Sequence, residues 1–188
     1  SIVPGFDRAE EKAVKAIQKH SMNINGNQYN RQIDAAYLLL GKARYFDNRF
    51  IPALDAFNYI LFKYPASSNI NLAKIWRAKT NLRLQNEDVV IKNLKRLIED
   101  YQLSNEDRAE ASSTLAQAYI NTKSLDSAIT QLQSASQLTK NKNFRGRLYF
   151  IEGQLYSVLG KKDSANLAFD KVIALKRKTS RAYMIAAH

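Results

Sequence analysis

The sequence contains no cysteine and only two histidines, His20 and His188, among its 188 residues. Without cysteine it has no disulfide framework, no thiolate ligand for zinc and no cysteine nucleophile. The two histidines fall at a predicted helix end and at the chain terminus, so a histidine-based metal site lacks ligands. No glycine-rich phosphate loop and no recognisable segment of a Ser-His-acid triad is present. We therefore predict a protein that is not an enzyme, with no catalytic residues, no metal ion and no cofactor.

Long apolar runs are also missing. The best run, Ala35 to Leu40, is far shorter than the roughly 20 residues that a membrane helix needs, so no membrane span is predicted. The first residues, Ser1 to Gly5, lack the basic-then-apolar layout of a signal peptide, which indicates an excised or processed segment. The absence of cysteine is compatible with either the cytosol or the periplasm.

Glycine and proline are scarce, with six and three residues, whereas alanine, leucine, lysine, glutamine, asparagine and arginine dominate. This balance favours helices over strands, and the composition predicts an all-α fold. A hydrophobic fraction of 45% is enough for a sizeable core. At about 150 residues per domain, the length predicts one domain over 1–188.

Internal repetition defines the architecture. One segment has the spacing of a tetratricopeptide repeat (TPR), in which two antiparallel helices carry bulky and small residues at fixed positions. Its matching residues are Tyr37, Leu40, Gly41, Ala53, Phe57, Ile60 and Pro65. Similar types recur 37, 38 and 37 residues further on, as the small residues Gly41, Ala78, Ala116 and Gly153 show. We predict a right-handed α-solenoid of antiparallel helix pairs.

The period divides the chain into four full repeats, over 34–70, 71–107, 109–144 and 146–179. Residues 1–30 are interpreted as a partial repeat with a connection, and 180–188 as the start of a truncated repeat. The connections between pairs are predicted at Pro65 to Ile70, Gln102 to Asp107 and Thr139 to Phe144, which are rich in serine, asparagine and lysine.

The residue types of the repeat are explained by packing. A small residue such as Gly41 lets the two helices of a pair approach closely, while large residues such as Phe57 and Phe169 are expected to fill the seam with the next pair. The acidic residue Asp34 and the pair Glu106-Asp107 lie at predicted helix starts, where carboxylates accept from free N–H groups. Neighbouring carboxylates on a helix point in different directions, so we interpret them as caps rather than as an acid/base pair.

The surface carries a formal net charge of +12. In repeats of this type the first helix of each pair lines the concave side, and mapping its groove-facing positions selects a basic, amide-rich set. An acidic protein or peptide segment suits such a lining, with the amides holding its backbone. The alternative is that the lysines and arginines only solvate helical faces. The predicted groove residues are Lys42, Tyr45, Lys79, Arg83, Gln117, Asn121, Arg147, Gln154 and Arg181.

The charge is concentrated towards the C-terminus. From Lys140 onward there are eleven basic and three acidic residues, so this part holds +8 of the +12. The run Lys176-Arg177-Lys178 is interpreted as a solvated helix end or as a contact for an acidic partner or an anionic lipid surface. RNA or DNA is a less favoured partner, because the aromatic residues are expected mostly at packing positions, leaving no stacking platform among the basic residues.

Longer strings of sequence suggest a narrower relationship. Two of them fall outside the repeat consensus, His20-Ser21-Met22 and Phe57-Asn58-Tyr59. Together with Tyr37 to Asp47, Ile75 to Lys79 and Leu175 to Lys178, they resemble the SprE/PorW type of gliding-motility and type IX secretion lipoproteins of Bacteroidetes.

The resemblance implies an outer-membrane lipoprotein exposed to the periplasm that links ring and motor components of the secretion machinery to the translocon. The lipidated cysteine of that family is absent here, which fits an internal fragment. Two alternatives remain: an adaptor of another envelope assembly, similar to the lipoproteins of outer-membrane β-barrel assembly, and an RNA-binding helical repeat. The sequence defines neither the partner nor the oligomeric state.

Overall fold

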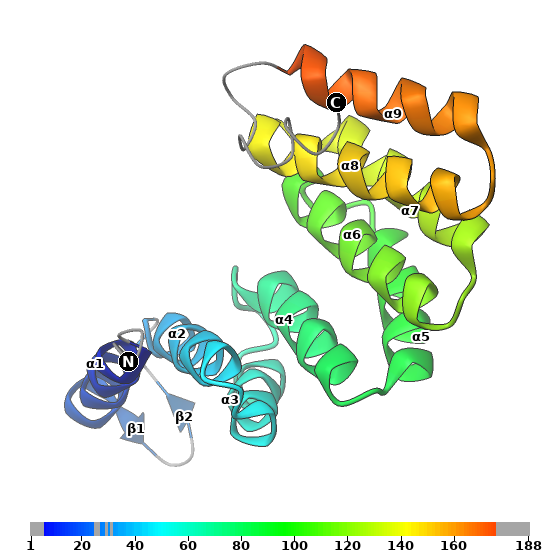
Figure 1. The fold of residues 1–188 in the computed structure, drawn as a ribbon. Helices are drawn as coiled ribbons and strands as arrows, with labels where there is room; N and C mark the ends of the chain where they lie inside the picture. Colours follow the sequence, from blue (N-terminus) through cyan, green and yellow to red (C-terminus); the bar gives the residue numbers. More distant parts are fainter. Residues whose placement is uncertain (1–5, 25–26, 29, 31, 176–188) are drawn as a thin grey trace. The chain divides into compact units, whose positions relative to one another are not determined.

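The computed structural model describes residues 6–24, 27–28, 30 and 32–175 (Figure 1). Within these residues the chain forms nine helices and one short hairpin. The elements are α1 (Phe6–His20), β1 (Asn23–Ile24), β2 (Asn27–Gln28), α2 (Ile33–Phe46), α3 (Phe50–Lys63), α4 (Ile70–Arg83), α5 (Glu87–Ile98), α6 (Asn105–Asn121), α7 (Leu125–Leu138), α8 (Lys142–Val158) and α9 (Lys162–Ala174). The predicted all-α solenoid fold is confirmed. The predicted truncated repeat over 180–188, the cationic run 176–178 and Arg181 lie outside the described residues.

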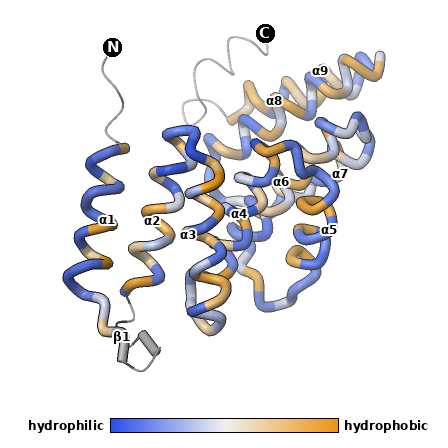
Figure 2. Tube along the Cα trace, turned by 90° about the horizontal axis from the view of Figure 1, so that it is seen from below, coloured by the Kyte–Doolittle hydropathy of each residue, from blue (hydrophilic) through white to orange (hydrophobic). Residues whose placement is uncertain are grey.

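The helices belong to two compact units, Ser1–Val89 (unit 1) and Val90–His188 (unit 2), which are described separately. In unit 1, α2 packs against α1 and α3, and α3 packs against α4. In unit 2, α7 lies between α6 and α8, and α9 packs on α8. Figure 2 shows α1 as mainly hydrophilic, and Ala13 is its buried residue. The connection expected within residues 1–30 contains the antiparallel hairpin β1-β2, which pairs Asn23 with Gln28.

The small residues of the repeat are explained by direct contact with a phenylalanine ring. A Cβ atom added at Gly41 would lie 2.4 Å from Cε1 of Phe57, and one at Gly153 would lie 2.5 Å from Cε1 of Phe169. Phe57 is fully buried in this position. It fills the seam within its own helix pair, and it also reaches the next pair, because its ring stacks on Trp76 of α4 with centroids 6.4 Å apart.

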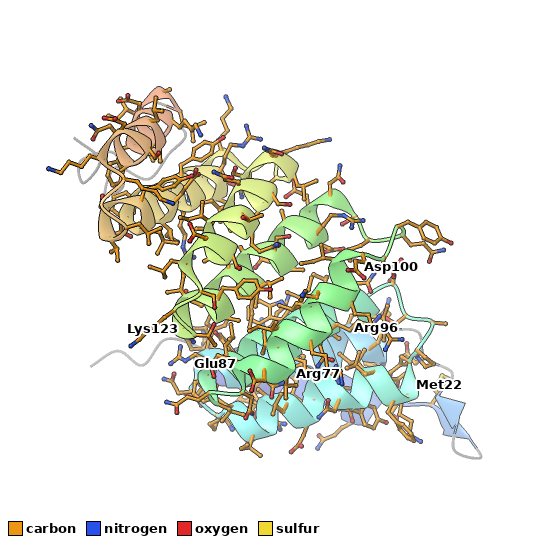
Figure 3. The ribbon with its side chains drawn as sticks, turned by 90° about the vertical axis from the view of Figure 1, so that its right-hand side faces the viewer. Met22, Arg77, Glu87, Arg96, Asp100 and Lys123 are labelled. Carbon is orange, nitrogen blue, oxygen red and sulfur yellow. The ribbon has the colours of Figure 1, made fainter. Side chains whose placement is uncertain are left out.

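The turn inside each helix pair repeats with the same backbone geometry. The residues Asn48, Gln85, Lys123 and Gly160 all have positive φ, between 59° and 72°. In each turn the next N–H bonds to a carbonyl five residues before it, as in Ser124 N to Tyr119 O at 2.8 Å (Figure 3 labels Lys123 here). This is the left-handed helix end that glycine favours, yet three of the four residues are not glycine. The turns therefore recur at the same intervals of 37 and 38 residues as the sequence repeat.

Two carboxylates at predicted helix starts reach the following connection, and one of them, Asp34, also accepts from Ala35 N at 2.7 Å, in line with the predicted capping role. Asp34 is buried and accepts hydrogen bonds from Ser67 Oγ and from Asn69 Nδ2, the latter at 3.2 Å. Glu106, also the second residue of its helix, accepts from Thr139 Oγ1 at 2.8 Å and Lys140 N at 2.6 Å. These two bonds hold the pKa of the Glu106 carboxyl below its usual value.

The predicted capping role is therefore wrong for Glu106, and a neighbouring serine caps the helix instead. Ser104 is the N-cap of α6, and its Oγ accepts from Asp107 N at 3.1 Å. Ser104 Oγ also donates to Asp107 Oδ2 at 2.8 Å. Of the two adjacent acidic residues, Asp107 thus bonds to the N-cap of its own helix, whereas Glu106 bonds to the connection that follows α7.

We expect Gly41→Ala to destabilise unit 1 and Gly153→Ala to have a smaller effect on unit 2. Both changes gain about 1 kcal/mol of helix propensity. Overpacking costs about 1–3 kcal/mol, and the buried Phe57 ring has less room to move than Phe169, which is half-buried. Chemical denaturation measures both variants, with fluorescence of Trp76, the sole tryptophan, following unit 1. Equal effects at the two glycines would contradict this explanation.

Helix α1 is joined to its neighbours by a carboxylate whose charge matters for stability. Glu10 Oε1 accepts from Arg44 Nε at 3.0 Å, and Glu10 Oε2 pairs with Arg49. Hydrogen bonding to Arg49, opposed in part by burial and aided by Arg44, lowers the pKa of Glu10 from its ordinary 4.5.

Because the folded-state pKa is depressed, this contribution to stability is present above pH 4.5 and lost as the pH falls through the folded value. We expect Glu10→Gln to lower the melting temperature of unit 1 at pH 7 and to lower it by less at pH 3. Melting followed by Trp76 fluorescence at both pH values checks this. A constant difference between the two proteins at pH 7 and pH 3 would exclude the ionic contribution.

Candidate partner-binding surface

Two helices of unit 1 present the same pattern of side chains. On each helix an apolar residue is followed after three residues by a lysine, and after four more by a large side chain. The two sets are 37 residues apart, which is the repeat period. We call them together the α2–α4 stripe, and its members are Leu39, Lys42 and Phe46 on α2 and Trp76, Lys79 and Arg83 on α4.

The centre of the stripe is the indole of Trp76. The Nζ atoms of Lys42 and Lys79 lie 5.1 Å and 4.5 Å from its ring centroid. Tyr45 and Phe46 meet the indole edge-on, with centroids at 5.4 Å and 5.6 Å. An ammonium over an indole gains about 0.5–1 kcal/mol at an exposed site. The two lysines are thus drawn together on α2 and α4 by one aromatic ring.

The edge of the stripe combines a third cation with exposed apolar groups. Arg83 Cζ lies 4.9 Å from the centroid of Phe50, and Arg83 Nη2 donates to Asn48 Oδ1 at 3.4 Å. Leu39 and Phe46 are 43% and 50% exposed. The surface therefore offers apolar contact area next to positive charge.

The structure brings together the four groove residues predicted in this unit. Arg83 is exposed, whereas Lys42, Lys79 and Tyr45 are half-buried, and the Tyr45 ring contacts those of Phe50 and Trp76. Sequence reasoning missed Leu39, Phe46 and Trp76 as parts of this surface. Their positions carry a signal, since Leu39 and Trp76 occupy equivalent places three residues before the predicted lysines.

The expectation that aromatic residues leave no platform among basic residues is wrong for this surface. Most rings do pack inside the repeats, but Trp76 and Phe50 each carry a cation. The same arrangement occurs in unit 2, where Lys171 Nζ lies 5.3 Å from the ring centroid of Tyr149.

The four predicted groove residues of unit 2 that lie within the described residues are exposed but differ in chemistry. Gln117 Nε2 donates to Asn121 Oδ1 at 2.9 Å along α6. On α8, Arg147 lies seven residues before Gln154, on the same face of the helix. The place equivalent to Arg147 on α6 holds the acidic Glu110. These faces are therefore rich in amides and balanced in charge.

A buried carboxylate lies elsewhere in unit 2. Glu152 is 2% exposed, and its Oε1 accepts from Gln133 Nε2 at 2.9 Å, which also contacts Tyr156 OH at 3.1 Å. Its Oε2 is buried and has no hydrogen-bond partner. The equivalent residue is Leu40 in α2 and Leu115 in α6. The carboxylate, the amide and the phenol form a hydrogen-bond network between α7 and α8.

Arg77 occupies the same repeat position in α4 (Figure 3). Its Nη1 lies 3.5 Å from Asn58 Oδ1, and Asn58 is the repeat equivalent of Gln133. Burial lowers the pKa of the Arg77 guanidinium. Two of the four repeats thus use a polar pair between consecutive helices where the others use leucine.

Over the described ranges, no set of three or more histidine, aspartate or glutamate side chains is grouped so that it could hold a metal ion. The helices of those same ranges also include none that is both long and apolar enough to cross a membrane.

Solved structures with a similar fold are TPR proteins. No protein-family model matches the chain, and no curated protein matches it. MamA is 25% identical over 73% of this chain and 74% of its own, with a TM-score of 0.58. YrrB, a TPR protein with an unusual peptide-binding site, is 17% identical over 97% of this chain and 83% of its own, with a TM-score of 0.61.

A third similar structure is the C-terminal part of a TPR repeat-containing protein from Cytophaga hutchinsonii. It is 15% identical over 92% of this chain, with a TM-score of 0.68, and this chain covers 60% of it. At this level of identity the likeness concerns the fold. The chain is therefore a TPR protein in its architecture, as its sequence period indicates.

We expect Glu152→Leu to raise the free energy of unfolding of unit 2 by about 1 kcal/mol. The change restores the residue type of α2 and α6 and removes a buried oxygen without a partner. Glu152→Gln, which keeps an acceptor for Gln133, is the matched control. Urea denaturation followed by circular dichroism measures both variants. Destabilisation by leucine together with wild-type stability of the glutamine variant would show that the polar network is worth more than its burial costs.

Proposed function

We propose that this chain is a non-enzymatic scaffold that binds a protein or peptide partner through its helix faces, with the α2–α4 stripe as the principal contact. The observation that carries the proposal is the convergence of Lys42 and Lys79 on Trp76, next to the exposed apolar groups of Leu39 and Phe46. Aromatic residues and cations next to apolar area are the groups that dominate protein interfaces.

The charge of the stripe indicates an acidic partner. Three of its six residues are cations, and none is acidic. Cations held beside apolar groups bind carboxylates more strongly than freely solvated ones, since less water has to be displaced around them. The net charge of +12 adds a general attraction that speeds encounter with an acidic partner.

The fold supports a peptide or protein ligand. YrrB, which is similar to this chain in fold, is described as having a peptide-binding site. The amides Gln117, Asn121 and Gln154 on the faces of unit 2 are suited to hold the backbone of a bound segment, and Arg147 to hold one of its carboxylates.

For the cellular setting, we propose a component of the type IX secretion and gliding machinery at the periplasmic face of the outer membrane. The support is the sequence resemblance carried by His20-Ser21-Met22, Phe57-Asn58-Tyr59 and the strings around them. In this setting the lipid anchor would lie outside these 188 residues. The alternative is an adaptor of another envelope assembly, which would use the same surface for a different partner.

A capture experiment tests both the stripe as the binding surface and the assignment to the secretion machinery. The tagged chain is incubated with solubilised envelope of a gliding bacterium, and bound proteins are identified by mass spectrometry. We expect secretion-machinery components to bind wild type and to be lost with Lys79→Glu plus Arg83→Glu. The matched control is Lys12→Glu plus Lys15→Glu, which makes the same charge change on two exposed lysines of α1.

The outcomes test the binding surface and the secretion assignment separately. Capture that is equal for both double variants and wild type would overturn the stripe as the binding site. Stripe-dependent capture of a different envelope complex would refute the secretion assignment and support the adaptor alternative. Circular dichroism melting of all three proteins ensures that lost capture is not lost folding.

A further inference from the structure

We infer that the α2–α4 stripe binds an amphipathic α-helix of the partner, in which an acidic residue is flanked by apolar residues three positions before and four positions after it. This inference rests on the proposed function and specifies the partner's chemistry and shape.

The spacing of the exposed apolar groups indicates a helix rather than an extended segment. Leu39 and Phe46 are seven residues apart on α2, which corresponds to about 10.5 Å along the helix axis. In a partner helix lying along α2, residues seven positions apart also lie on one face and have the same spacing along the axis. An extended segment repeats a face every two residues, so its side chains fall about 7 Å or about 13 Å apart and match only one of the two groups.

The position of the charge indicates where the acidic residue lies. Lys42 lies between Leu39 and Phe46 along α2, and its Nζ is directed over the Trp76 indole, where Lys79 Nζ also lies. A carboxylate of the partner placed between these two ammonium groups would accept charge-assisted hydrogen bonds from both. The acidic residue is therefore expected midway between the two apolar contacts.

Unit 2 provides an internal comparison. The places equivalent to Leu39, Lys42 and Phe46 hold Thr114, Gln117 and Asn121 on α6, and Ile151, Gln154 and Val158 on α8. Glutamine takes the place of lysine both times. The same fold thus presents a cationic face in unit 1 and an uncharged one in unit 2, so recognition of an acidic helix belongs to unit 1.

The test uses the full chain and a synthetic helical peptide without aromatic residues, with the pattern Leu-x-x-Glu-x-x-x-Leu. Trp76, the sole tryptophan of the sequence, reports binding at the stripe by its fluorescence. We expect saturable binding that weakens with added salt, because the lysines are near the surface. Peptides with glutamine or lysine in place of the glutamate should bind about tenfold more weakly or worse.

Two variants separate charge from apolar contact. Lys42→Gln plus Lys79→Gln installs the residue that unit 2 uses, and we expect it to bind the Glu and Gln peptides equally. Leu39→Ala should weaken the binding of every peptide by a similar factor. Ile51→Ala, the matched change at an exposed residue of α3, should have no effect on binding. A peptide that differs from the first only by a proline at one central x position tests the helix, since proline interrupts it.

Several results would overturn the inference. One is binding of the proline peptide as tightly as of the helical peptide. Another is a preference of the double glutamine variant for the glutamate peptide as strong as that of the wild type. The third is tighter binding of a single-stranded RNA oligonucleotide than of the peptide at the same salt concentration. If the peptide fails while envelope capture still depends on Lys79 and Arg83, only the helical pattern is wrong. If capture is also independent of these residues, the proposed function fails with it.

Discussion

The architecture depends on the close contact between a helix glycine and a phenylalanine ring of its partner helix. At Gly41 and Gly153 no Cβ atom fits against Phe57 and Phe169. This contact fixes the rotation of α2 and α8, because the glycine face must point at the second helix of the pair. Residues on the opposite face, such as Leu39, Lys42 and Phe46, are then directed away from that helix. Packing inside the pair thus decides which side chains become available for binding.

Much of this could be predicted from the sequence, since the repeat is a packing pattern. A period of 37 and 38 residues, with a small residue in one helix and a large ring in the next, specifies the pairs and their phase. The phase in turn identifies the exposed positions, so Lys42, Lys79 and Arg83 were predictable as neighbours on one surface. Periodicity places them on the same face even though they are up to 41 residues apart.

Other features depend on side-chain geometry that periodicity does not contain. The sequence places Trp76 inside a helix, but the meeting of two lysines on its ring follows from their length and from the approach of α2 and α4. Asp34 and Glu106 look like ordinary caps by position, and they bind the following connection because the next repeat folds back onto them. Polar pairs such as Glu152 with Gln133 replace leucine packing without disturbing the repeat period.

The structure also changes the meaning of the net charge. A total of +12 suggests a uniformly basic surface, but individual cations are used in different ways. Arg44 and Arg49 are paired with Glu10 and hold α1, so they contribute little attraction to a ligand. Arg108 donates to the carbonyls of Asp100 and Leu103 and closes a connection. Lys42 and Lys79, in contrast, lie over the Trp76 ring, next to the partly exposed side chains of Leu39 and Phe46.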